Sequence, residues 1–256
     1  MRIYPDSRFI QLYPAFRSVD SRLSFISNDA IEPVEAEPLL PYGDALKIIL
    51  NELENGRDVL VGDTHTEMSH HLFYAVAVKL ARSRGIEFVS AMELPSQLGN
   101  KLTEFTQSPI MPVDIAMNFI KQYQAKMISE YESSLKNFIL PVLQLEIVPV
   151  IPFDMCPRPS NYYEEAEEDR VNRYMAQTIE CTRLKYPDLP IFGLAGARHV
   201  KKDAIPGYCP DFLAVHLGRN ATVYDKSGLD IYKPGDFDFI VDLPHIEEIV
   251  KNLRGY

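Results

Sequence analysis

The sequence predicts one α/β domain over residues 41–256, with a mainly parallel sheet flanked by helices and a helical insertion at about 97–146. Two observations carry this prediction. Short apolar runs rich in β-branched residues alternate with longer amphipathic segments, which is the pattern of strand–helix–strand units in a parallel sheet. No change of composition divides the chain after residue 40. Residues 1–40 have no clear period and several prolines, so we expect an irregular arm with a short strand near Phe25.

The first half of the domain reads as helix, strand, helix and strand. A helix from Tyr42 places four apolar side chains on one face and ends at Gly56. The apolar run in 57–63 is the first long strand, and the second helix runs over 70–85 to a terminal glycine. Residues 86–94 form the next strand. The insertion that follows contributes tyrosines and methionines at helical spacing, which more often indicates core packing than a ligand groove.

The second half repeats the alternation. Residues 147–154 are predicted as a strand whose prolines, Pro149 and Pro152, suit an edge. A long helix with an acidic first turn, over 164–187, precedes a strand over 190–196. Three further apolar runs, at 212–218, 221–225 and 237–243, are expected to be edge strands, and the last helix is expected over 245–254.

Composition and charge narrow the classes of function. The chain has 256 residues, is 46% hydrophobic, and has a formal net charge of −10. Nucleic acid and anionic membranes are therefore not expected as partners, because both need a basic surface. No run of roughly 18 apolar residues, as a membrane span requires, is present, and the first residues do not resemble a signal peptide. The expectation is a cytoplasmic protein, although an effector exported without a cleaved signal would look the same.

Several common site types are missing from the sequence. The three cysteines, Cys156, Cys181 and Cys209, form no Cys-x-x-Cys pair, so neither a disulfide framework nor a thiolate zinc site is predicted. No phosphate-binding loop, dinucleotide fingerprint or Gly-x-Ser-x-Gly elbow occurs. A covalent nucleophile is therefore disfavoured.

Two histidines instead follow predicted strands in Gly-x-x-His turns. Asp63 and His65 come after the first long strand, and His199 comes after Gly193 and Gly196. We expect Gly62 to allow a tight turn there. Glu93 and Asp154 stand at the ends of two other strands. Because ligands gather at the carboxyl ends of parallel strands, these groups predict either general acid–base chemistry or a divalent metal site.

Each of these residues also has a simpler interpretation. A single Gly-x-x-His turn is weak evidence, and a carboxylate after a strand is usually a solvated loop residue or a cap. His70 and His71 open the helix after the first turn. One of them is expected to face solvent, although either could line the site. His216 and His245 are expected to be structural or superficial.

The sequences VLVGDTHTEMSHH, AMEL and LAGARHV resemble the superfamily of Tiki proteases, TraB-like proteins, erythromycin esterases, the multocida-type toxin domain and ChaN-like haem-binding proteins. The resemblance covers roughly residues 45–220. The spacing of His65, His70 and His71 is most similar to the ChaN-like branch. VNRYMAQTI resembles a superfamily helix with a polar residue before Met-Ala, which is Asn172 here, but Val171 stands where an arginine is common. The first turn has Gly-Asp where Gly-Glu is common.

The preferred hypothesis is a hydrolase with His65, Glu93, His199 and Asp63 as catalytic residues. The Tiki resemblance implies a metal such as manganese or cobalt, and zinc also suits the ligand set His65, His199, Glu93 and Asp154. The esterase resemblance implies water activation by His and Glu without an obligatory metal. Small molecules or peptides are the expected substrates, and His70, His71, Asn172 and Arg198 are expected to line the ligand.

Two other functions stay open. The ChaN-like spacing and the tyrosines and methionines of the insertion favour a haem- or ligand-binding protein without catalysis. The irregular N-terminal arm permits an exported effector or toxin domain. The sequence does not predict the oligomeric state.

Overall fold

The computed structural model describes residues 38–65, 67–96, 148–155, 165–202, 213–218 and 235–255. The expected strand near Phe25, nearly all of the N-terminal arm, the helical insertion and the apolar run at 221–225 lie outside these residues.

The described residues form a seven-stranded sheet in which every neighbouring pair is parallel. The order across the sheet is β1-β7-β6-β2-β5-β3-β4. The strands are β1 Leu39–Pro41, β2 Val59–Asp63, β3 Val89–Pro95, β4 Val150–Asp154, β5 Ile191–Gly196, β6 Leu213–Gly218 and β7 Phe239–Asp242. The predicted α/β class with a mainly parallel sheet is therefore confirmed.

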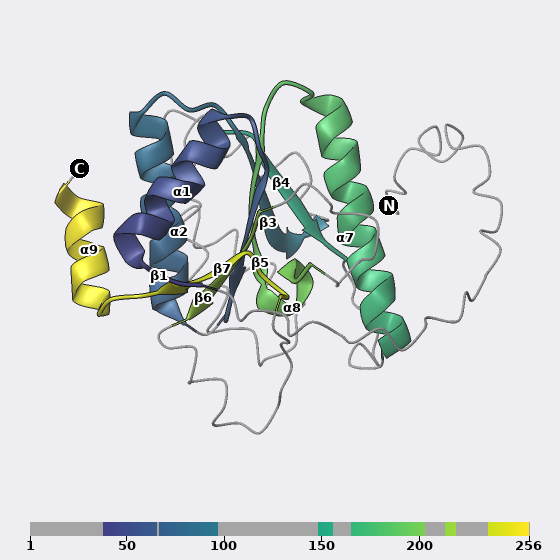
Figure 1. The fold of residues 1–256 in the computed structure, drawn as a ribbon. Coiled ribbons are helices and arrows are strands. Elements are labelled where there is room, and N and C mark those ends of the chain that lie inside the picture. Colours follow the sequence, from purple (N-terminus) through teal and green to yellow (C-terminus); the bar gives the residue numbers. More distant parts are fainter. Residues whose placement is uncertain are drawn as a thin grey trace, which may run out of the picture. The chain divides into compact units, whose positions relative to one another are not determined.

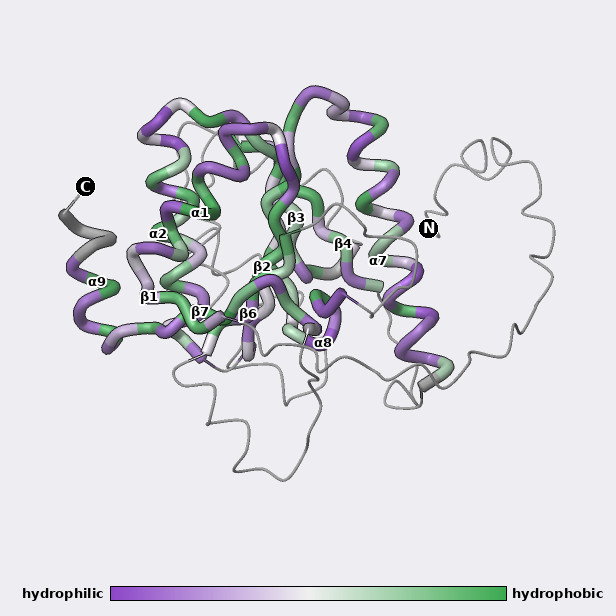
Figure 2. The backbone as a smooth tube through the Cα atoms, in the orientation of Figure 1, coloured by the Kyte–Doolittle hydropathy of each residue, from purple (hydrophilic) through white to green (hydrophobic). Residues whose placement is uncertain are grey.

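Helices cover both faces of the sheet (Figure 1). One layer holds α1 (Tyr42–Glu54), α2 (Met68–Ser83) and α9 (Ile246–Gly255). The other layer holds α7 (Glu165–Lys185) and the short α8 (Ala197–Val200). Apolar side chains separate into two clusters, one beneath each layer. Figure 2 shows hydrophobic residues along much of β2 and β3 and hydrophilic residues over much of α7.

The order of the strands corrects two expectations from the sequence. β6 and β7 lie inside the sheet, between β1 and β2, and are not edge strands. Five successive residues of β6 are buried, as expected for a strand covered on both faces. Among the described strands, the edges of the sheet are β1 and β4. Leu39 and Leu40 fall within the predicted irregular arm but belong to β1 and pair with β7.

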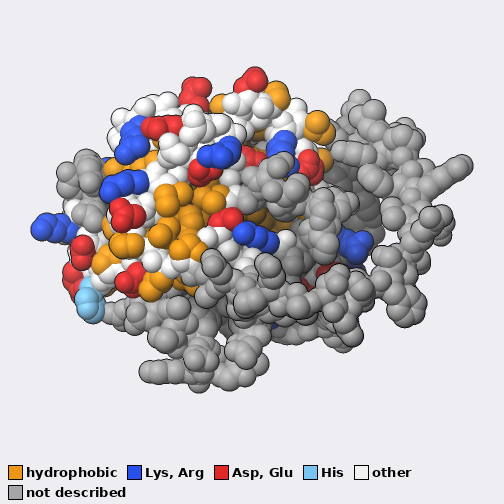
Figure 3. Space-filling model, in the orientation of Figure 1, with side chains coloured by type: hydrophobic (Ala, Val, Ile, Leu, Met, Phe, Trp, Pro, Cys, Tyr) orange, Lys and Arg blue, Asp and Glu red, His pale blue; other side chains and the backbone are white. Residues whose placement is uncertain are grey.

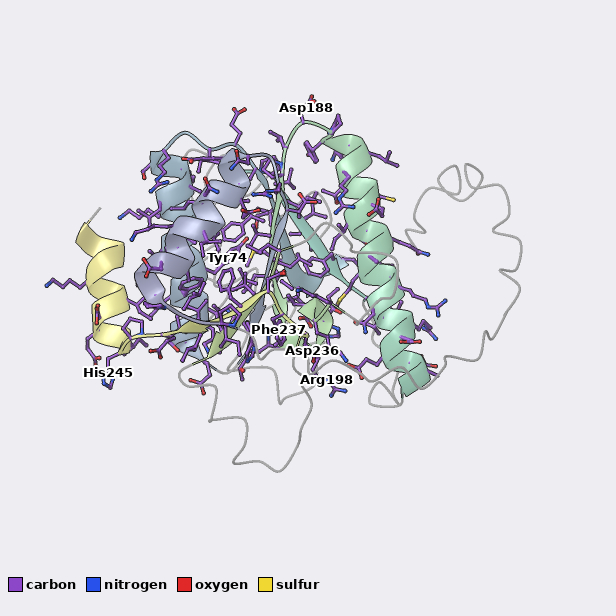
Figure 4. All side chains as sticks on the ribbon, viewed as in Figure 1. Tyr74, Asp188, Arg198, Asp236, Phe237 and His245 are labelled. Carbon is purple, nitrogen blue, oxygen red and sulfur yellow. The ribbon has the colours of Figure 1, made fainter. Side chains whose placement is uncertain are left out.

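Two polar contacts fix the helices against the sheet away from the strand ends. The buried hydroxyl of Tyr74 on α2 donates to the Phe192 carbonyl over 2.7 Å and lies 3.0 Å from the Ser90 hydroxyl (Figure 4). Asp58, just before β2, accepts from the Ile191 N–H over 2.6 Å and from two nitrogens of Arg183 over 3.0 and 2.8 Å. The buried Tyr74 hydroxyl and the partly buried Asp58 carboxylate thus add hydrogen bonds to the apolar packing between the helices and the sheet.

The surface contains no single-sign patch on the face drawn in Figure 3, where acidic and basic side chains alternate. Within the described ranges, no helix is both long enough and apolar enough to cross a bilayer.

Candidate active site

The two Gly-x-x-His turns pack directly against each other. β2 and β5 are neighbours, and Asp63 is in register with Gly196. A Cβ atom on Gly62 would lie 2.9 Å from the Ala197 Cα, and one on Gly196 would lie 3.3 Å from the His65 ring. The absence of a side chain at Gly62 therefore allows the second turn to pack closely, and its absence at Gly196 does the same for the first turn.

This packing corrects the expected role of Gly62. Its φ is not positive, since the described glycines with positive φ are Gly56, Gly85 and Gly235. Gly62 continues β2 and is needed for the close approach of α8, not for a tight turn.

His65 lies between two buried carboxylates. Its Nδ1 is 2.9 Å from the Asp63 Oδ1, and its Nε2 is 3.4 Å from the Glu93 Oε2. The side chains of Asp63 and Glu93 are almost fully buried, whereas that of His65 is 21% exposed. His65 is therefore the member of this trio that solvent can reach.

These contacts set the charge of the trio. Burial by itself would lower the pKa of His65, but the carboxylates of Asp63 and Glu93 outweigh it and raise this pKa well above its usual value. Burial would raise the pKa of Asp63, but the charges and hydrogen bonds of His65 and His71 hold it well below its usual range. Both carboxylates thus favour the charged form of His65.

Glu93 is held by the backbone and faces both imidazoles. Its Oε2 accepts the Gly196 N–H over 2.6 Å. Its Oε1 lies 3.7 Å from the His199 Nε2. The β3–β4 register shifts between Met92 and Pro95, so Glu93 stands at an irregularity of the strand. Such bulges re-aim side chains at the rims of sheets.

The turn after β5 is held from the side by α7. The His199 Nδ1 lies 2.5 Å from the Asn172 Oδ1. One turn earlier on α7, Glu168 accepts from the Arg198 guanidinium over 2.6 Å. The His199 ring is 6% exposed and the Arg198 side chain 41%. Two of the residues expected to line a ligand, Asn172 and Arg198, therefore lie beside His199.

His70 and His71 are both buried, which corrects the expectation that one faces solvent. The His70 Nδ1 accepts the Thr64 N–H over 2.9 Å, and burial lowers the pKa of His70 to about 3. The His71 Nε2 lies 3.1 Å from the Asp63 Oδ2 and 3.3 Å from the His65 carbonyl oxygen. The geometry makes these two histidines supports for Asp63 and the turn that carries His65.

Asp154 ends β4, and His216 lies two residues before the end of β6. Asp154 on β4 is in register with Pro95 on β3, and its side chain is buried. His216 is in register with Gly62, and its ring stacks on Phe237 with centroids 4.8 Å apart. Burial lowers the pKa of His216 to about 4. His216 had been expected to be structural or superficial. The one signal for its position is that it too falls near a strand end.

Comparison with known proteins gives structural likeness only. No description of a known protein family matches the chain, and no curated protein sequence matches it. The type III effector HopBA1 superimposes with a TM-score of 0.53 at 11% sequence identity, covering 74% of this chain and 89% of the effector. ChaN of Campylobacter jejuni, a structure described by its cofacial haem binding, gives a TM-score of 0.45 at 12% identity, covering 79% and 98%. The likeness to HopBA1 supports the fold.

The donor set does not fit a metal ion in this geometry. Among the residues that the structure describes, no three His, Cys, Asp or Glu side chains are arranged to hold one. A histidine ligand must offer a lone pair, but both ring nitrogens of His65 lie against carboxylate oxygens. We therefore derive no step through the metal that the resemblance implies. The segment expected to line a haem groove, at about 97–146, lies outside the described residues.

Proposed function

We propose that this protein is a hydrolase that activates water with His199 and Glu93 while the imidazolium of His65 stabilises developing negative charge. The observation that carries the proposal is the position of Glu93. One oxygen is 3.4 Å from the His65 Nε2, and the other is 3.7 Å from the His199 Nε2. The imidazoles of His65 and His199 both face the buried Glu93 carboxylate, but their other ring nitrogens have different partners. Such a difference in surroundings suits one imidazole to an acid role and the other to a base role.

The second distance supports a site for the attacking water. At 3.7 Å the Glu93 Oε1 and the His199 Nε2 are too far apart for a direct hydrogen bond, yet close enough for one water to contact both. A water that donates to both groups presents a lone pair to an incoming carbonyl carbon. General-base assistance of this kind contributes typically about 10²- to 10⁴-fold to a rate.

The proton balance of the reaction closes within the site. Water adds to the carbonyl carbon, its proton moves to His199, and the carbonyl oxygen becomes an alkoxide next to the charged His65. When the alkoxide collapses, the bond to the leaving group breaks and His199 returns the proton to that group. Asp63 stays ionised and holds His65 in its charged form. The substrate class is a carbonyl compound, either an ester, a lactone or a peptide.

Membership of the Tiki, erythromycin esterase and ChaN-like superfamily is part of the proposal. It is supported by the two Gly-x-x-His turns, which lie on neighbouring strands and exchange glycine contacts. The metal-free form of the mechanism is supported by the paired ring nitrogens of His65. The competing form of the mechanism uses a divalent ion, namely manganese, cobalt or zinc.

The test is hydrolysis of a panel of esters, lactones and peptides by the full chain before and after treatment with a chelator. We expect turnover that survives chelation and falls at least about 100-fold in His65→Asn and His199→Gln. His245→Asn, at an exposed position just before α9, is the matched control. Turnover that disappears on chelation and returns with manganese would establish the metal-dependent form. Full turnover in both site variants would refute the proposal.

Two alternatives are outcomes of companion measurements. A Soret shift on adding haem to a protein that hydrolyses nothing would replace the hydrolase with a ligand-binding protein. Delivery of the protein from bacteria into host cells would make it an exported effector, in place of the cytoplasmic protein that we propose.

A further inference from the structure

Two consecutive histidines in the first turn of α2 contact the end of β2 and the two residues that follow it. The ring of His70 contacts the backbone of Thr64. The ring of His71 contacts the side chain of Asp63 and the backbone of His65. Both rings are buried. Each of the three residues from 63 to 65 is therefore held by one of the two imidazoles.

The contact of His70 fixes which of its ring nitrogens carries hydrogen. The Thr64 N–H donates to the Nδ1 of His70 over 2.9 Å, so this nitrogen must present a lone pair. Burial lowers the pKa of His70 to about 3, which keeps the imidazole neutral at neutral pH. A neutral imidazole has one N–H, and in His70 this N–H is therefore at Nε2.

The surroundings of His71 require the opposite hydrogen-bonding role. Its Nε2 lies 3.3 Å from the His65 carbonyl oxygen and 3.1 Å from the Asp63 Oδ2. A carbonyl oxygen and an ionised carboxylate only accept hydrogen bonds. A lone pair on Nε2 would face two acceptors in a buried position, which is costly, so Nε2 must carry hydrogen. This conclusion holds for both the neutral and the charged form of the His71 ring.

We propose that His70 and His71 are positioning residues with opposite roles, His70 as a hydrogen-bond acceptor and His71 as a hydrogen-bond donor. Together they fix the backbone at Thr64 and His65 and one carboxylate oxygen of Asp63. The other oxygen of Asp63 lies 2.9 Å from the His65 Nδ1. The two roles follow from the contacts. Their effect on turnover rests on the proposed function, in which His65 stabilises developing charge.

Asparagine and glutamine substitutions distinguish the two roles. The amide oxygen of asparagine is as many bonds from Cα as the Nδ1 of histidine, and the amide nitrogen of glutamine is as many bonds from Cα as the Nε2. His70→Asn therefore keeps an acceptor where one is needed, and His71→Gln keeps a donor. The exchanged variants, His70→Gln and His71→Asn, place the required atom at the wrong distance and are the matched controls.

The first experiment is NMR spectroscopy of the ¹⁵N-labelled full chain at about pH 7, above the usual pKa of histidine. We expect a scalar coupling between the Thr64 amide nitrogen and the His70 Nδ1, transmitted through their hydrogen bond. We also expect two-bond ¹H–¹⁵N spectra in which His70 and His71 both carry hydrogen on Nε2. The signals are assigned with His70→Asn and His71→Gln.

The wild-type spectrum decides the proposal even where a variant fails to fold. Hydrogen on the Nδ1 of His70 would overturn it, and so would an Nε2 of His71 that carries no hydrogen. Absence of the coupling between Thr64 and His70 would also overturn it.

Turnover provides the second readout. We expect kcat to fall about 10- to 100-fold in the exchanged variants, the scale on which a displaced reactive group acts, and about fivefold or less in His70→Asn and His71→Gln. KM should change little. Equal losses in the asparagine and glutamine variants at either position would show that the ring only fills space there, and would overturn the proposal.

The two proposals fail separately. The expected spectrum in a protein that hydrolyses nothing would refute the hydrolase and leave the hydrogen-bonding roles of His70 and His71 intact. Hydrolysis by a protein with hydrogen on the Nδ1 of His70 would do the reverse.

Discussion

The Oε1 of Glu93 lies 3.7 Å from the Nε2 of His199, although the two residues are more than a hundred positions apart in the sequence. The other oxygen of Glu93 is fixed by the Gly196 N–H and faces His65. A buried carboxylate held at one oxygen and left to face an imidazole with the other is rigid enough to orient a reactant.

The first prediction concerns the reciprocal glycines. In Gly196→Ala the new Cβ would lie 3.3 Å from the Glu93 Oε2 and from the His65 Nε2, so this pair must move apart by a few tenths of an ångström. We expect turnover to fall at least about tenfold with a small loss of stability.

Gly62→Ala should lower the stability of the protein more than its turnover. Its Cβ would meet the Ala197 Cα at 2.9 Å, and backbone yields less readily than a side chain. We expect a loss of about 1–3 kcal/mol in the free energy of unfolding, measured by denaturant titration. Gly43→Ala, with open space around it, is the control and should be neutral or slightly stabilising. Wild-type turnover in Gly196→Ala would contradict the packing described here.

The second prediction is a pH dependence of stability due to His65. Because its folded pKa is raised, its contribution is fully present below the unfolded value of about 6.5 and is lost as pH rises through the folded pKa. We expect the stability difference between wild type and His65→Asn to shrink as the pH rises above about 6.5.

The contribution of Asp63 to stability depends on pH in the opposite direction. Its folded pKa is depressed, so its contribution is present above the unfolded value of about 3.9 and is lost as pH falls through the folded pKa. The free energies of unfolding of the wild type and of His65→Asn are compared in urea at several pH values, with His245→Asn as the control. This comparison separates the contribution of His65, which is lost at alkaline pH, from that of Asp63, which is lost at acid pH. A difference that stays constant across the alkaline range would show that His65 is not held in its charged form.

The third prediction concerns Asp58, which joins the start of β5 to the end of α7. Asp58→Asn loses the charge that serves one backbone N–H and two guanidinium nitrogens. We expect a loss of about 1.5–3 kcal/mol in the free energy of unfolding. Asp44→Asn breaks an exposed pair with Lys47 and should cost less than about 1 kcal/mol. Equal losses in the two variants would contradict the proposed clamp.

The fourth prediction concerns the Tyr74 hydroxyl, which is buried and lies between Phe192 and Ser90. Tyr74→Phe leaves the Phe192 carbonyl without this donor and should lower the thermal midpoint, with a cost of about 1–3 kcal/mol. Turnover should be unchanged because the ring and the strand ends are untouched. A wild-type midpoint would show that this hydrogen bond contributes nothing net.

Much of the fold could be predicted from periodicity. The helix from Tyr42 and the strands before Asp63, Glu93 and Gly196 lie where their apolar patterns place them. Strand order could not be predicted in the same way. β6 reads as a short apolar run, and only its pairing with both β2 and β7 shows that it is interior. Local patterns report burial and leave the choice of neighbours to packing over long distances.

The sequence could predict which residues form the site, but much less well which of them contact each other. Parallel strand ends bring Asp63, Glu93 and Gly196 to one edge, which the strand–helix alternation implies. The pairing of His199 with Asn172 depends on how α7 lies against α8, and no local pattern specifies that. The role of Gly196 could not be predicted either, because the sequence does not distinguish a glycine needed for close packing from one needed for a turn.

The most direct test of the account is the hydrolysis rate of Glu93→Gln beside that of the wild type, both stripped of metal and assayed on one substrate identified from the panel. The amide can still accept the Gly196 N–H, but it has lost the charge that faces both imidazoles. We predict that kcat falls at least about 100-fold while the protein stays folded. Wild-type turnover in folded Glu93→Gln would contradict the assignment of this carboxylate to the reaction.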